Sequence, residues 1–584
     1  MPVHNADIAA VFDEIADLLE LEDANPFRIR AYRNAARVVD GLGQDLRAMV
    51  AGGEDLTALP GIGKDLAAKI GELVGTGKSS FLERLRGEVP PAIAELLHIP
   101  NLGPKRVRSL WHDLGIQTVA QLREAARAGH IRELPGFGAR SETKILEAVE
   151  ARLSKDRRFK LATAAQYADA LVAHLEAAAG VERVVVAGSY RRRRETVGDL
   201  DILVVAAPDS RAMAAFTGYD EVGEVLASGP TRASIRLKSG LQVDLRVVPA
   251  ESYGAALCYF TGSKAHGIAL RGLAQEKGLK INEYGVFKGQ KRIAGDSEES
   301  VYRAVGLPYI PPELREDRGE IAAAREGRLP RLIELGDLKG DLHAHTSATD
   351  GHDRLEDMAR AAAAAGLEYL AITDHSRRLA MAHGLDAERL ARQMDEIDRL
   401  NETLAGIRLL KGIEVDILED GGLDLPDAVL ARLDVVVGAV HSHFDLPRDS
   451  QTERILRAMD HPHFTLLAHP SGRLIGEREA YLVDMPRIIR HARERGCWLE
   501  LNSHPERLDL LDTWCMAAKA EGVLVAIDSD AHRTGDFANL PFGIGQARRG
   551  WLEAGDVANT HSLAQLGKLL GHRLVKAAGT RVRA

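Results

Sequence analysis

Cysteine is scarce in this sequence, and long hydrophobic runs are missing. The three cysteines, Cys258, Cys497 and Cys515, are too few and too scattered for a disulfide framework, so we expect a reducing, cytoplasmic setting. No stretch of about 18 apolar residues occurs, which argues against a membrane-spanning helix. The first residues also lack the basic, apolar and small-residue regions of a signal peptide. These absences favour a protein that works inside the cell and does not bind membranes.

The chain has 584 residues and a net charge of −9, and this charge is unevenly distributed. A length of this order predicts three or four domains at about 150 residues each. Residues 1–160 carry as many basic as acidic residues, and so do residues 161–318, so the acidic excess lies after residue 318. Fifteen of the 21 histidines also follow residue 318. An acidic, histidine-rich C-terminal part indicates metal binding, whereas local arginine clusters in the neutral part permit phosphate binding.

Residues 1–155 show the apolar spacing of short helices, punctuated by three similar turns. These turns are LPGIGKDLAAKI (59–70), IPNLGPKRVRSL (99–110) and LPGFGARSETKI (134–145). Each places glycine just before a helix start, where unpaired backbone N–H groups point outward and a phosphate can approach closely. Such turns bind DNA phosphates without reading the base sequence. We therefore predict that the turn glycines contact DNA: Gly61, Gly63, Gly103, Gly136 and Gly138.

Residues 160–318 contain β-branched runs with a constellation of acidic residues. Gly188 and Ser189 follow one predicted strand, as a phosphate-cradling turn would. Asp199 and Asp201 are two residues apart, which on a strand places both carboxylates on one face, and Asp244 lies in another predicted strand. Three carboxylates on neighbouring strands suit a pair of Mg²⁺ or Mn²⁺ ions, which would serve a primer 3′-hydroxyl and a triphosphate. We therefore predict a nucleotidyl-transfer site with these three aspartates as catalytic metal ligands.

From residue 340 onward, short apolar strand patterns alternate with helical patterns, which predicts an α/β barrel or a doubly wound sheet. Histidine-containing motifs such as DLHAHT, TDHS, AVHSHF and DSDAH occur mostly where these strands end. The chemistry of α/β barrels is found at this end of the strands. Mixed nitrogen and oxygen ligands suit Zn²⁺, Mn²⁺ or Fe²⁺ better than Mg²⁺.

Four segments of the N-terminal half resemble family X DNA polymerases: residues 25–39, 59–70, 188–204 and 258–286. The resemblance implies a helix-hairpin-helix domain and a nucleotidyltransferase-type polymerase core. It implies nucleotide binding by the residues that match the family's motifs: Ser189, Arg192, Gly198, Arg246, Tyr259, Phe260, Gly262 and Arg271. It also implies that Lys69, with Tyr32 in the same pocket, forms a Schiff base with an abasic-site sugar, although Asp65 could pair with Lys69 and keep it protonated. The family's base-contacting asparagine is replaced by Gly267, so we expect weaker nucleotide binding or lower fidelity.

The C-terminal part resembles the polymerase and histidinol phosphatase (PHP) family of metal-dependent phosphoesterases. The resemblance implies a distorted (β/α)7 barrel that binds up to three ions and hydrolyses DNA 3′ ends or abasic sites. All nine ligand positions of the family are filled: His343, His345, Asp350, His375, Glu414, His441, His469, Asp530 and His532. We also consider Arg473 and His504 as phosphate-binding residues, and His443 as a residue that orients a ligand or touches the substrate.

Together these patterns predict a multidomain enzyme of mixed α and α/β structure. The expected divisions are a helical DNA-binding domain, a helix-hairpin-helix subdomain, a palm, a nucleotide-binding subdomain, a linker and a PHP domain, at residues 1–90, 91–160, 161–255, 256–318, 319–338 and 339–584. We predict a monomeric gap-filling DNA polymerase and 3′–5′ exonuclease that acts on gapped or nicked DNA with deoxynucleoside triphosphates. Two alternatives stay open at this point: a nuclease with feeble polymerase activity, and a non-catalytic scaffold that binds DNA ends.

Overall fold

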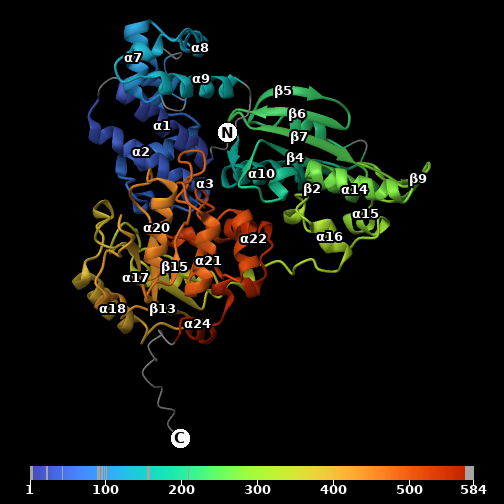
Figure 1. The fold of residues 1–584 in the computed structure, drawn as a ribbon. Helices are drawn as coiled ribbons and strands as arrows, with labels where there is room; N and C mark the ends of the chain where they lie inside the picture. The colour runs from blue at the N-terminus through green and yellow to red at the C-terminus, as the bar shows by residue number, and fades with distance from the viewer. Residues whose placement is uncertain are drawn as a thin grey trace.

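The structure is a computed structural model that describes residues 4–571 except 22–23, 43, 89–92, 94–95, 98, 100–101, 154–157 and 208–209. Figure 1 shows the arrangement: a helical N-terminal region, a twisted sheet with a small α/β unit beside it, and a barrel formed by the C-terminal part. No helix in this described part of the chain is long and apolar enough to cross a membrane.

The N-terminal region consists of short helices around one continuous apolar core. The helices are α1 (Asn5–Leu21), α2 (Pro26–Asp40), α3 (Leu46–Ala51), α4 (Lys64–Thr76), α5 (Ser80–Glu88), α7 (Pro104–Leu114), α8 (Val119–Ala128) and α9 (Ala139–Leu153). Gly63 and Gly103 are the N-caps of α4 and α7, and Gly138 directly precedes α9. Gly61 and Gly136 have positive φ angles of 61° and 82°, a conformation that glycine adopts without strain. The predicted turns at 59–70 and 134–145 are therefore tight entries into helices. In the turn at 99–110, Gly103 caps α7 and residues 100–101 lie outside the described part of the chain.

The second part is a five-stranded sheet in the order β2-β4-β7-β6-β5. Its strands are β2 (Val181–Val186), β4 (Asp199–Ala206), β5 (Val222–Ser228), β6 (Arg232–Leu237) and β7 (Gln242–Val248). The central pair β4 and β7 is parallel and the other pairs are antiparallel. Helices α10 (Leu161–Glu176) and α12 (Ala212–Thr217) share the apolar core on one face. The short α11 (Gly188–Arg191) directly follows β2, and a two-stranded ladder joins β1 (Phe159–Lys160) to β3 (Thr196–Val197).

A smaller α/β unit follows the sheet. It contains α13 (Tyr253–Thr261), α14 (Lys264–Glu276), the antiparallel strands β8 (Lys280–Asn282), β9 (Gly285–Lys288) and β10 (Lys291–Ala294), α15 (Glu298–Ala304) and α16 (Glu320–Arg325). Helix α16 falls within the segment that we expected to be a linker. It contributes Ala324 to the core of this unit, and the buried Glu320 accepts a hydrogen bond from His266 across 2.6 Å. The segment therefore packs against the preceding unit along this helix.

The C-terminal part forms seven parallel strands in chain order, β11 to β17. They are β11 (Gly340–Asp341), β12 (Tyr369–Ile372), β13 (Arg408–Asp416), β14 (Val435–Ala439), β15 (Leu466–Leu467), β16 (Trp498–Asn502) and β17 (Val525–Asp528). A parallel bridge between Ala344 and Ala531 joins the segments that follow β11 and β17, so the sheet nearly closes on itself. Interior positions are buried and apolar along almost every strand. The predicted distorted (β/α)7 barrel is confirmed.

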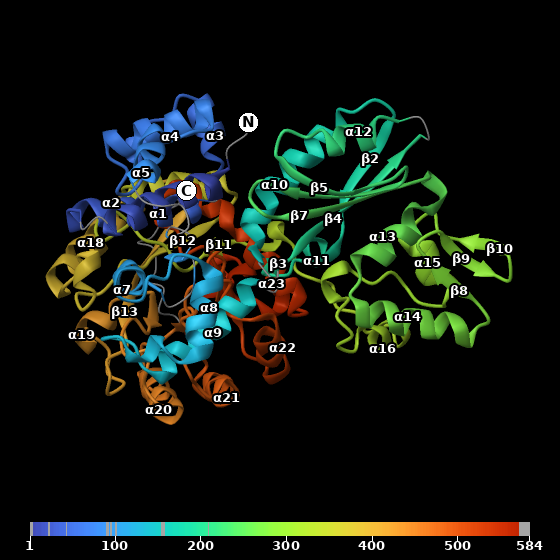
Figure 2. The ribbon, with the colours of Figure 1, turned by 90° about the horizontal axis from the view of Figure 1, so that it is seen from above.

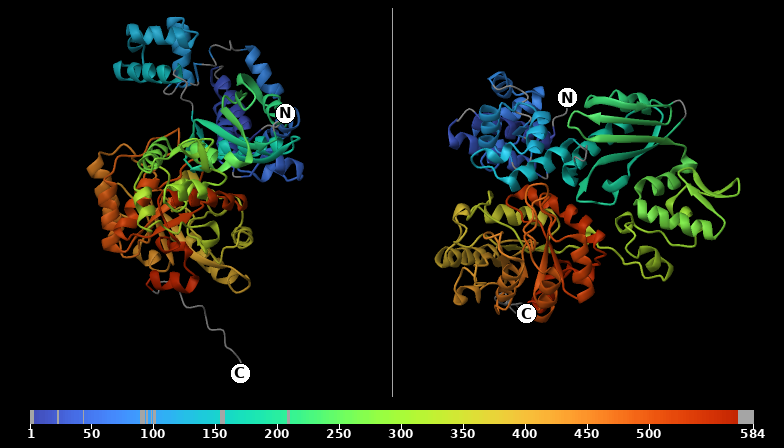
Figure 3. Two further views of the ribbon diagram at one scale, coloured as in Figure 1. Left: turned by 90° about the vertical axis from the view of Figure 1, so that its right-hand side faces the viewer. Right: turned by 45° about the horizontal axis from the view of Figure 1, so that its top comes forward.

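Helices cover the outside of the barrel. They are α17 (Leu355–Ala364), α18 (Ala387–Leu400), α19 (Asp427–Leu430), α20 (Arg448–Met459), α21 (Met485–Arg495), α22 (Asp512–Glu521), α23 (Leu540–Arg549) and α24 (Leu563–Leu569). Helix α23 also packs against the core of the five-stranded sheet through Phe542. In Figures 2 and 3 the N-terminal helices lie beside the barrel, opposite the small α/β unit. Lys160 bridges these regions because its ammonium donates to Asp40 at 2.9 Å and to Glu506 at 3.2 Å.

Candidate active sites

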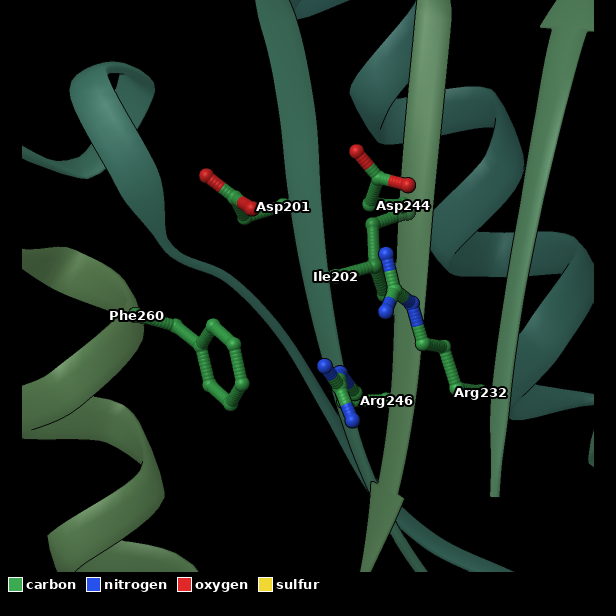
Figure 4. Close-up of a pocket in the computed structure, with 6 residues that line it drawn as sticks. All are labelled: Asp201, Ile202, Arg232, Asp244, Arg246 and Phe260. Atoms are coloured by element: carbon green, nitrogen blue, oxygen red, sulfur yellow. The ribbon is translucent and has the colours of Figure 1, made fainter. Parts of the chain in front are cut away.

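The first candidate site lies on the parallel pair of strands at the centre of the five-stranded sheet. Asp201 on β4 is directly opposite Asp244 on β7, and Asp199 lies on the same half-buried face of β4 as Asp201. The two opposed aspartates line a pocket that Arg232, Arg246, Ile202 and Phe260 complete. Figure 4 shows Asp201 and Asp244 side by side, with Phe260 facing them from α13. The sequence spacing predicted the shared face of Asp199 and Asp201, and the strand crossover brings in Asp244.

The electrostatics of this site favour a bound cation. Burial, together with the charges of Asp199 and Asp244, raises the pKa of Asp201 to about 7, and the charge of Arg192 opposes this shift. Burial and Asp244 also raise the pKa of Asp199. Carboxylates that repel one another in this way are stabilised in their charged form by a divalent cation. The carboxylate of Asp244 accepts hydrogen bonds from Ser234 on the neighbouring strand β6 and from Gln242 on its own strand.

The first residue of α11, Gly188, must be glycine for the site to form. Gly188 has a φ angle of 61°, and a Cβ atom built on it would overlap the carboxylate of Asp201. Ser189 follows in α11, with its backbone at the start of that helical turn. The structure therefore places the predicted phosphate-cradling turn directly beside one of the predicted metal ligands.

The arginine run after Ser189 divides into two roles. Arg191 is a structural residue, because its guanidinium makes a two-pronged ion pair with Glu298 at 2.9 and 2.7 Å. Arg192, the predicted triphosphate-binding residue, donates from Nε to Glu316 at 3.1 Å and from Nη1 to the carbonyl of Thr261. It thus lies at the junction of α11 and α13, on the side of the sheet where Asp201 is found.

The predicted sugar-packing residues are at the C-terminal end of α13. The rings of Tyr259 and Phe260 meet edge to face with centroids 5.2 Å apart, and the guanidinium of Arg246 lies 5.3 Å from the Phe260 ring centroid. Gly262 follows with a φ angle of 68°, where L side chains are rarely found. Gly198 directly precedes β4, and Arg158 comes within 3.5 Å of a Cβ built there.

Gly267 and Arg271 are neighbours on α14, one helical turn apart. A Cβ built on Gly267 would lie 3.3 Å from Nη1 of Arg271, which is the flexible end of a long side chain.

We predict that Gly267→Asn lowers the dissociation constant for the matching nucleotide about fivefold, because one added hydrogen bond contributes about 1 kcal/mol. Gly272→Asn is the matched control, since a Cβ on this glycine of the same helix meets nothing within 4 Å. An unchanged affinity in Gly267→Asn, measured by nucleotide titration on gapped DNA, would contradict this.

Lys69 lies on α4, and its ammonium contacts two other side chains, Asp65 and Phe81. Nζ donates to Asp65 at 2.5 Å and lies 5.5 Å from the ring centroid of Phe81. The Tyr32 ring stacks on Phe81 at 5.9 Å, and the buried hydroxyl of Tyr32 has no hydrogen-bond partner within the part of the chain that the structure describes. The structure thus brings Tyr32 and Lys69 to the same aromatic side chain, and it confirms the contact between Lys69 and Asp65.

The second candidate site lies at the C-terminal ends of the barrel strands. The structure gathers the predicted ligands into three overlapping groups whose ligand atoms lie within 4.8 Å of one another. These groups are His345–Asp350–His375–His532, His343–His345–Asp530 and His375–Glu414–His441. His469 joins them through Glu414, which it meets at 2.9 Å. All nine predicted positions therefore converge, although their segments are spread over almost 190 residues.

Glu414 is the central carboxylate of this cluster. Its oxygens lie 2.6 Å from Nδ1 of His375, 2.9 Å from Nε2 of His469 and 3.2 Å from Nε2 of His441. Although burial favours the neutral ring, Glu414 and Asp350 raise the pKa of His375 to about 10. Burial together with the neighbouring His532 and His375 lowers the pKa of His345 to about 4.

The residues present fit bound metal ions. Several buried atoms of the cluster have no hydrogen-bond partner among the described residues: Nε2 of His343, both ring nitrogens of His345 and Oδ1 of Asp350. Buried polar atoms without partners are rare in folded proteins and costly, and metal coordination satisfies them. A set of imidazoles and carboxylates that share ligand positions is the donor chemistry expected for transition-metal ions.

Carboxylates and an amide behind the cluster orient its members, and sequence reasoning missed them. Glu500 accepts from Nδ1 of His343 at 2.6 Å, and Asp416 accepts from Nδ1 of His441 at 2.5 Å. Asn502 donates to Asp530 at 2.9 Å. These contacts fix the ring orientation and direct Nε2 toward the centre. A signal was present, because Asp416 lies two residues after Glu414, and Glu500 and Asn502 are polar residues in an otherwise apolar strand.

The additional phosphate-binding candidates have other partners. Arg473 donates to Glu195, which directly precedes β3, at 2.7 Å and to the carbonyl of Leu508. The ring of His504 packs against the N-terminal region, because a Cβ built on Gly41 would lie 3.2 Å from its Cε1. Arg507 was not predicted, yet its Nε lies 3.7 Å from Oδ2 of Asp530 and its side chain is 21% exposed. Arg507 is therefore better placed than Arg473 or His504 to meet a phosphate at this centre.

Comparisons with known proteins cover both sites. Family models match for a helix-hairpin-helix domain (residues 3–79), a SAM-like helix-hairpin-helix tandem (93–151), a DNA polymerase beta thumb (256–316) and a PHP domain (341–515). The DNA polymerase/3′-5′ exonuclease PolX of Bacillus subtilis is 39% identical over 96% of this chain and 98% of its own. A probable phosphatase of Acetivibrio thermocellus is 31% identical over 33% of this chain and 78% of its own. A Leishmania infantum polymerase beta structure aligns with 38% of this chain and 98% of its own, at 22% identity and a TM-score of 0.26. The chain therefore belongs to the PolX family, the family X DNA polymerases that carry a C-terminal PHP domain.

Proposed function

We propose that this protein fills short gaps in DNA and trims DNA 3′ ends, using two separate sites on one chain. The proposal rests on the presence of two sites in one chain. In the first, Asp201 and Asp244 face each other on paired strands beside the turn at Gly188. In the second, nine candidate metal ligands cluster at one end of the barrel. A relative that matches along 96% of the chain is named for both a polymerase and an exonuclease activity. Neither a nuclease with incidental polymerase activity nor a non-catalytic scaffold is favoured by this match.

At the first site, the chain's residues bind and orient a primer end and a deoxynucleoside triphosphate. Asp199, Asp201 and Asp244 would hold Mg²⁺ or Mn²⁺, which supplies charge neutralisation and activation of the attacking oxygen when bound. The Gly188–Ser189 turn and Arg192 meet the phosphates, and their positive and dipolar groups stabilise charge that develops on the leaving pyrophosphate. Tyr259 and Phe260 pack against the incoming sugar, while Gly267 leaves its base without a side-chain contact at that position.

At the second site, the barrel cluster binds the phosphodiester at a 3′ end. Its nine residues would hold up to three ions, Mn²⁺, Zn²⁺ or Fe²⁺, which supply water activation and stabilisation of the leaving oxygen when bound. Glu500 and Asp416 keep the rings of His343 and His441 in the required orientation. Arg507, whose Nε lies 3.7 Å from Asp530, would hold a phosphate oxygen beside that residue. Family X gap filling and 3′ trimming then take place on the same polypeptide.

The decisive experiment uses a labelled duplex with a one-nucleotide gap and the purified full-length chain. Mg²⁺ and Mn²⁺ are compared, with and without nucleotides, and primer extension and primer shortening are scored in the same reactions. We expect extension by one nucleotide when the matching nucleotide is present, and shortening when nucleotides are omitted. A protein that does neither, with both metals, would refute the proposal.

Abasic-site lyase activity of Lys69 is a separate prediction. Borohydride trapping on DNA with an incised abasic site should be lost in Lys69→Ala, because the amine is the proposed nucleophile. Asp65→Asn should raise trapping about threefold, because Asp65 accepts a hydrogen bond that the attacking amine has to release. Lys64→Ala, at the start of the same helix, is the control and should trap as the natural chain does. Trapping that persists in Lys69→Ala would assign the activity to another amine.

The expected domain divisions, partners and location stay part of this proposal. Gapped or nicked DNA would bind along the glycine turns at the entries of α4, α7 and α9. The three cysteines are buried in the structure, and a reducing cytoplasm stays the proposed location. A monomer is proposed, and its mass is checked by light scattering.

A further inference from the structure

Helix α23 of the barrel packs directly against the polymerase-like part. Phe542 lies against the apolar core of the five-stranded sheet. A Cβ built on Gly545 would lie 3.2 Å from Cβ of Arg193, so the two backbones approach closely here. Arg193 directly follows Arg192, the residue that we propose binds the triphosphate. The face of α23 thus reaches the edge of the nucleotide site, more than 300 residues away in sequence.

Arg549, the last residue of α23, makes three contacts in this interface. Its Nη1 donates to the backbone carbonyl of Arg192 at 2.8 Å and to Oε1 of Glu316 at 2.8 Å, and its Nη2 donates to Asp512 at 2.7 Å. The Arg549 side chain is only 2% exposed. Buried charge-assisted hydrogen bonds of this kind hold their partners in defined positions. Arg549 therefore holds in place both the backbone carbonyl of Arg192 and the carboxylate of Glu316, to which the Arg192 side chain donates.

Glu316 is shared between the two arginines. It accepts from Nε of Arg192 at 3.1 Å on the same oxygen that accepts from Arg549. Arg192 is also held through Nη1 by the carbonyl of Thr261, so two of its three guanidinium nitrogens are occupied. Its Nη2 has no protein partner among the residues that the structure describes, and it is left for a ligand. The arginine is thus oriented before any phosphate arrives, which reduces the ordering cost of binding.

We infer that Arg549 of the PHP domain is a positioning residue for the nucleotide site of the polymerase. It acts through Glu316 and the Arg192 backbone and does not touch the nucleotide. The barrel would then help the polymerase reaction by orienting Arg192, and this role would not depend on the metal cluster of the barrel. This inference rests on the proposed role of Arg192 in binding the triphosphate.

The test measures single-nucleotide gap filling by the full-length protein, on a primer whose 3′-terminal phosphorothioate linkage resists trimming. In Arg549→Ala we expect the KM for the nucleotide to rise roughly tenfold with kcat changed less than about twofold, because a binding interaction is weakened. Glu316→Gln keeps the shape of the side chain and should raise the KM similarly. The double variant should be no worse than either single variant, because both changes break the same chain of contacts. Trimming of ordinary DNA 3′ ends should stay at its natural rate in all three.

Arg548→Ala is the matched control. Arg548 is the neighbouring residue on α23 and also bridges the interface, through Glu313 at 2.7 Å, but it does not contact Arg192 or Glu316. A KM that rises as much in Arg548→Ala as in Arg549→Ala would overturn the inference, since any loosening of the interface would then suffice. A natural KM in Arg549→Ala or, if that variant does not fold, in Glu316→Gln would overturn it as well. Arg192→Ala is measured in parallel: if it leaves the KM unchanged, the proposed role of Arg192 itself fails.

Discussion

Asp201→Asn should reduce nucleotide incorporation by roughly a thousandfold while trimming of 3′ ends continues at its natural rate. The carboxylate is one of three that would hold the ions of the polymerase site, and losing such a group removes several kcal/mol of transition-state stabilisation. The amide that replaces it has the same shape, so the sheet and the turn at Gly188 stay intact. Incorporation is measured as single-turnover gap filling on a primer that resists trimming, and trimming is measured on a 3′-labelled strand without nucleotides.

The same change should stabilise the metal-free protein at high pH. Burial and the neighbouring Asp199 and Asp244 raise the pKa of Asp201 from 3.8 to about 7. A carboxyl group with a raised pKa in the folded state destabilises the fold, and this cost grows as the pH rises from about 4 to about 7 and levels off above that. In chelator, the Tm of Asp201→Asn should therefore exceed that of the natural protein by more at about pH 8 than at about pH 6.

Glu182→Gln provides the control for both measurements. Glu182 is an exposed carboxylate on β2 of the same sheet, so its loss should change neither incorporation nor the pH dependence of the Tm. Incorporation by Asp201→Asn within tenfold of the natural rate would show that the paired carboxylates are not the polymerase site.

Glu414→Gln should abolish 3′-end trimming, with a fall of roughly a thousandfold, and leave gap filling unchanged. Glu414 is the carboxylate that His375, His441 and His469 all contact, so its charge is shared by much of the cluster. An amide of the same shape has no negative charge, and its NH₂ group cannot serve as a ligand. Bound transition metal per chain, measured by elemental analysis after dialysis, should fall together with the activity.

Glu419→Gln is the matched control for this change. Glu419 lies in the loop that follows the same strand, with 61% of its side chain exposed and only a 3.8 Å contact to His443. Its replacement should preserve both trimming and metal content. Trimming at the natural rate in Glu414→Gln would place the hydrolytic centre elsewhere, whereas a loss of gap filling in the same variant would mean that the two sites are not separable.

The sequence by itself determined the local features of both sites. The two-residue spacing of Asp199 and Asp201 sets them on one face of a strand because side chains alternate along it. The glycines at 61, 63, 103, 136 and 138 predicted helix entries because these entries are built within a few residues. The alternation of strands and helices after residue 340 predicted an α/β barrel or a doubly wound sheet, and the resemblance to the PHP family implied the barrel, whose strands carry His343, His375 and His441 to the same end.

Only the tertiary structure decided the contacts between distant segments. Three contacts show this, between residues that lie 43 to 233 positions apart. Asp201 lies opposite Asp244, Glu500 accepts a hydrogen bond from His343, and Glu316 accepts hydrogen bonds from both Arg192 and Arg549. No periodicity encodes such pairs, because local patterns fix which face of a strand or helix a side chain occupies, but not which other segment covers that face. That choice depends on how the whole chain packs its apolar faces together, and the buried charges then find their partners where the packing leaves them.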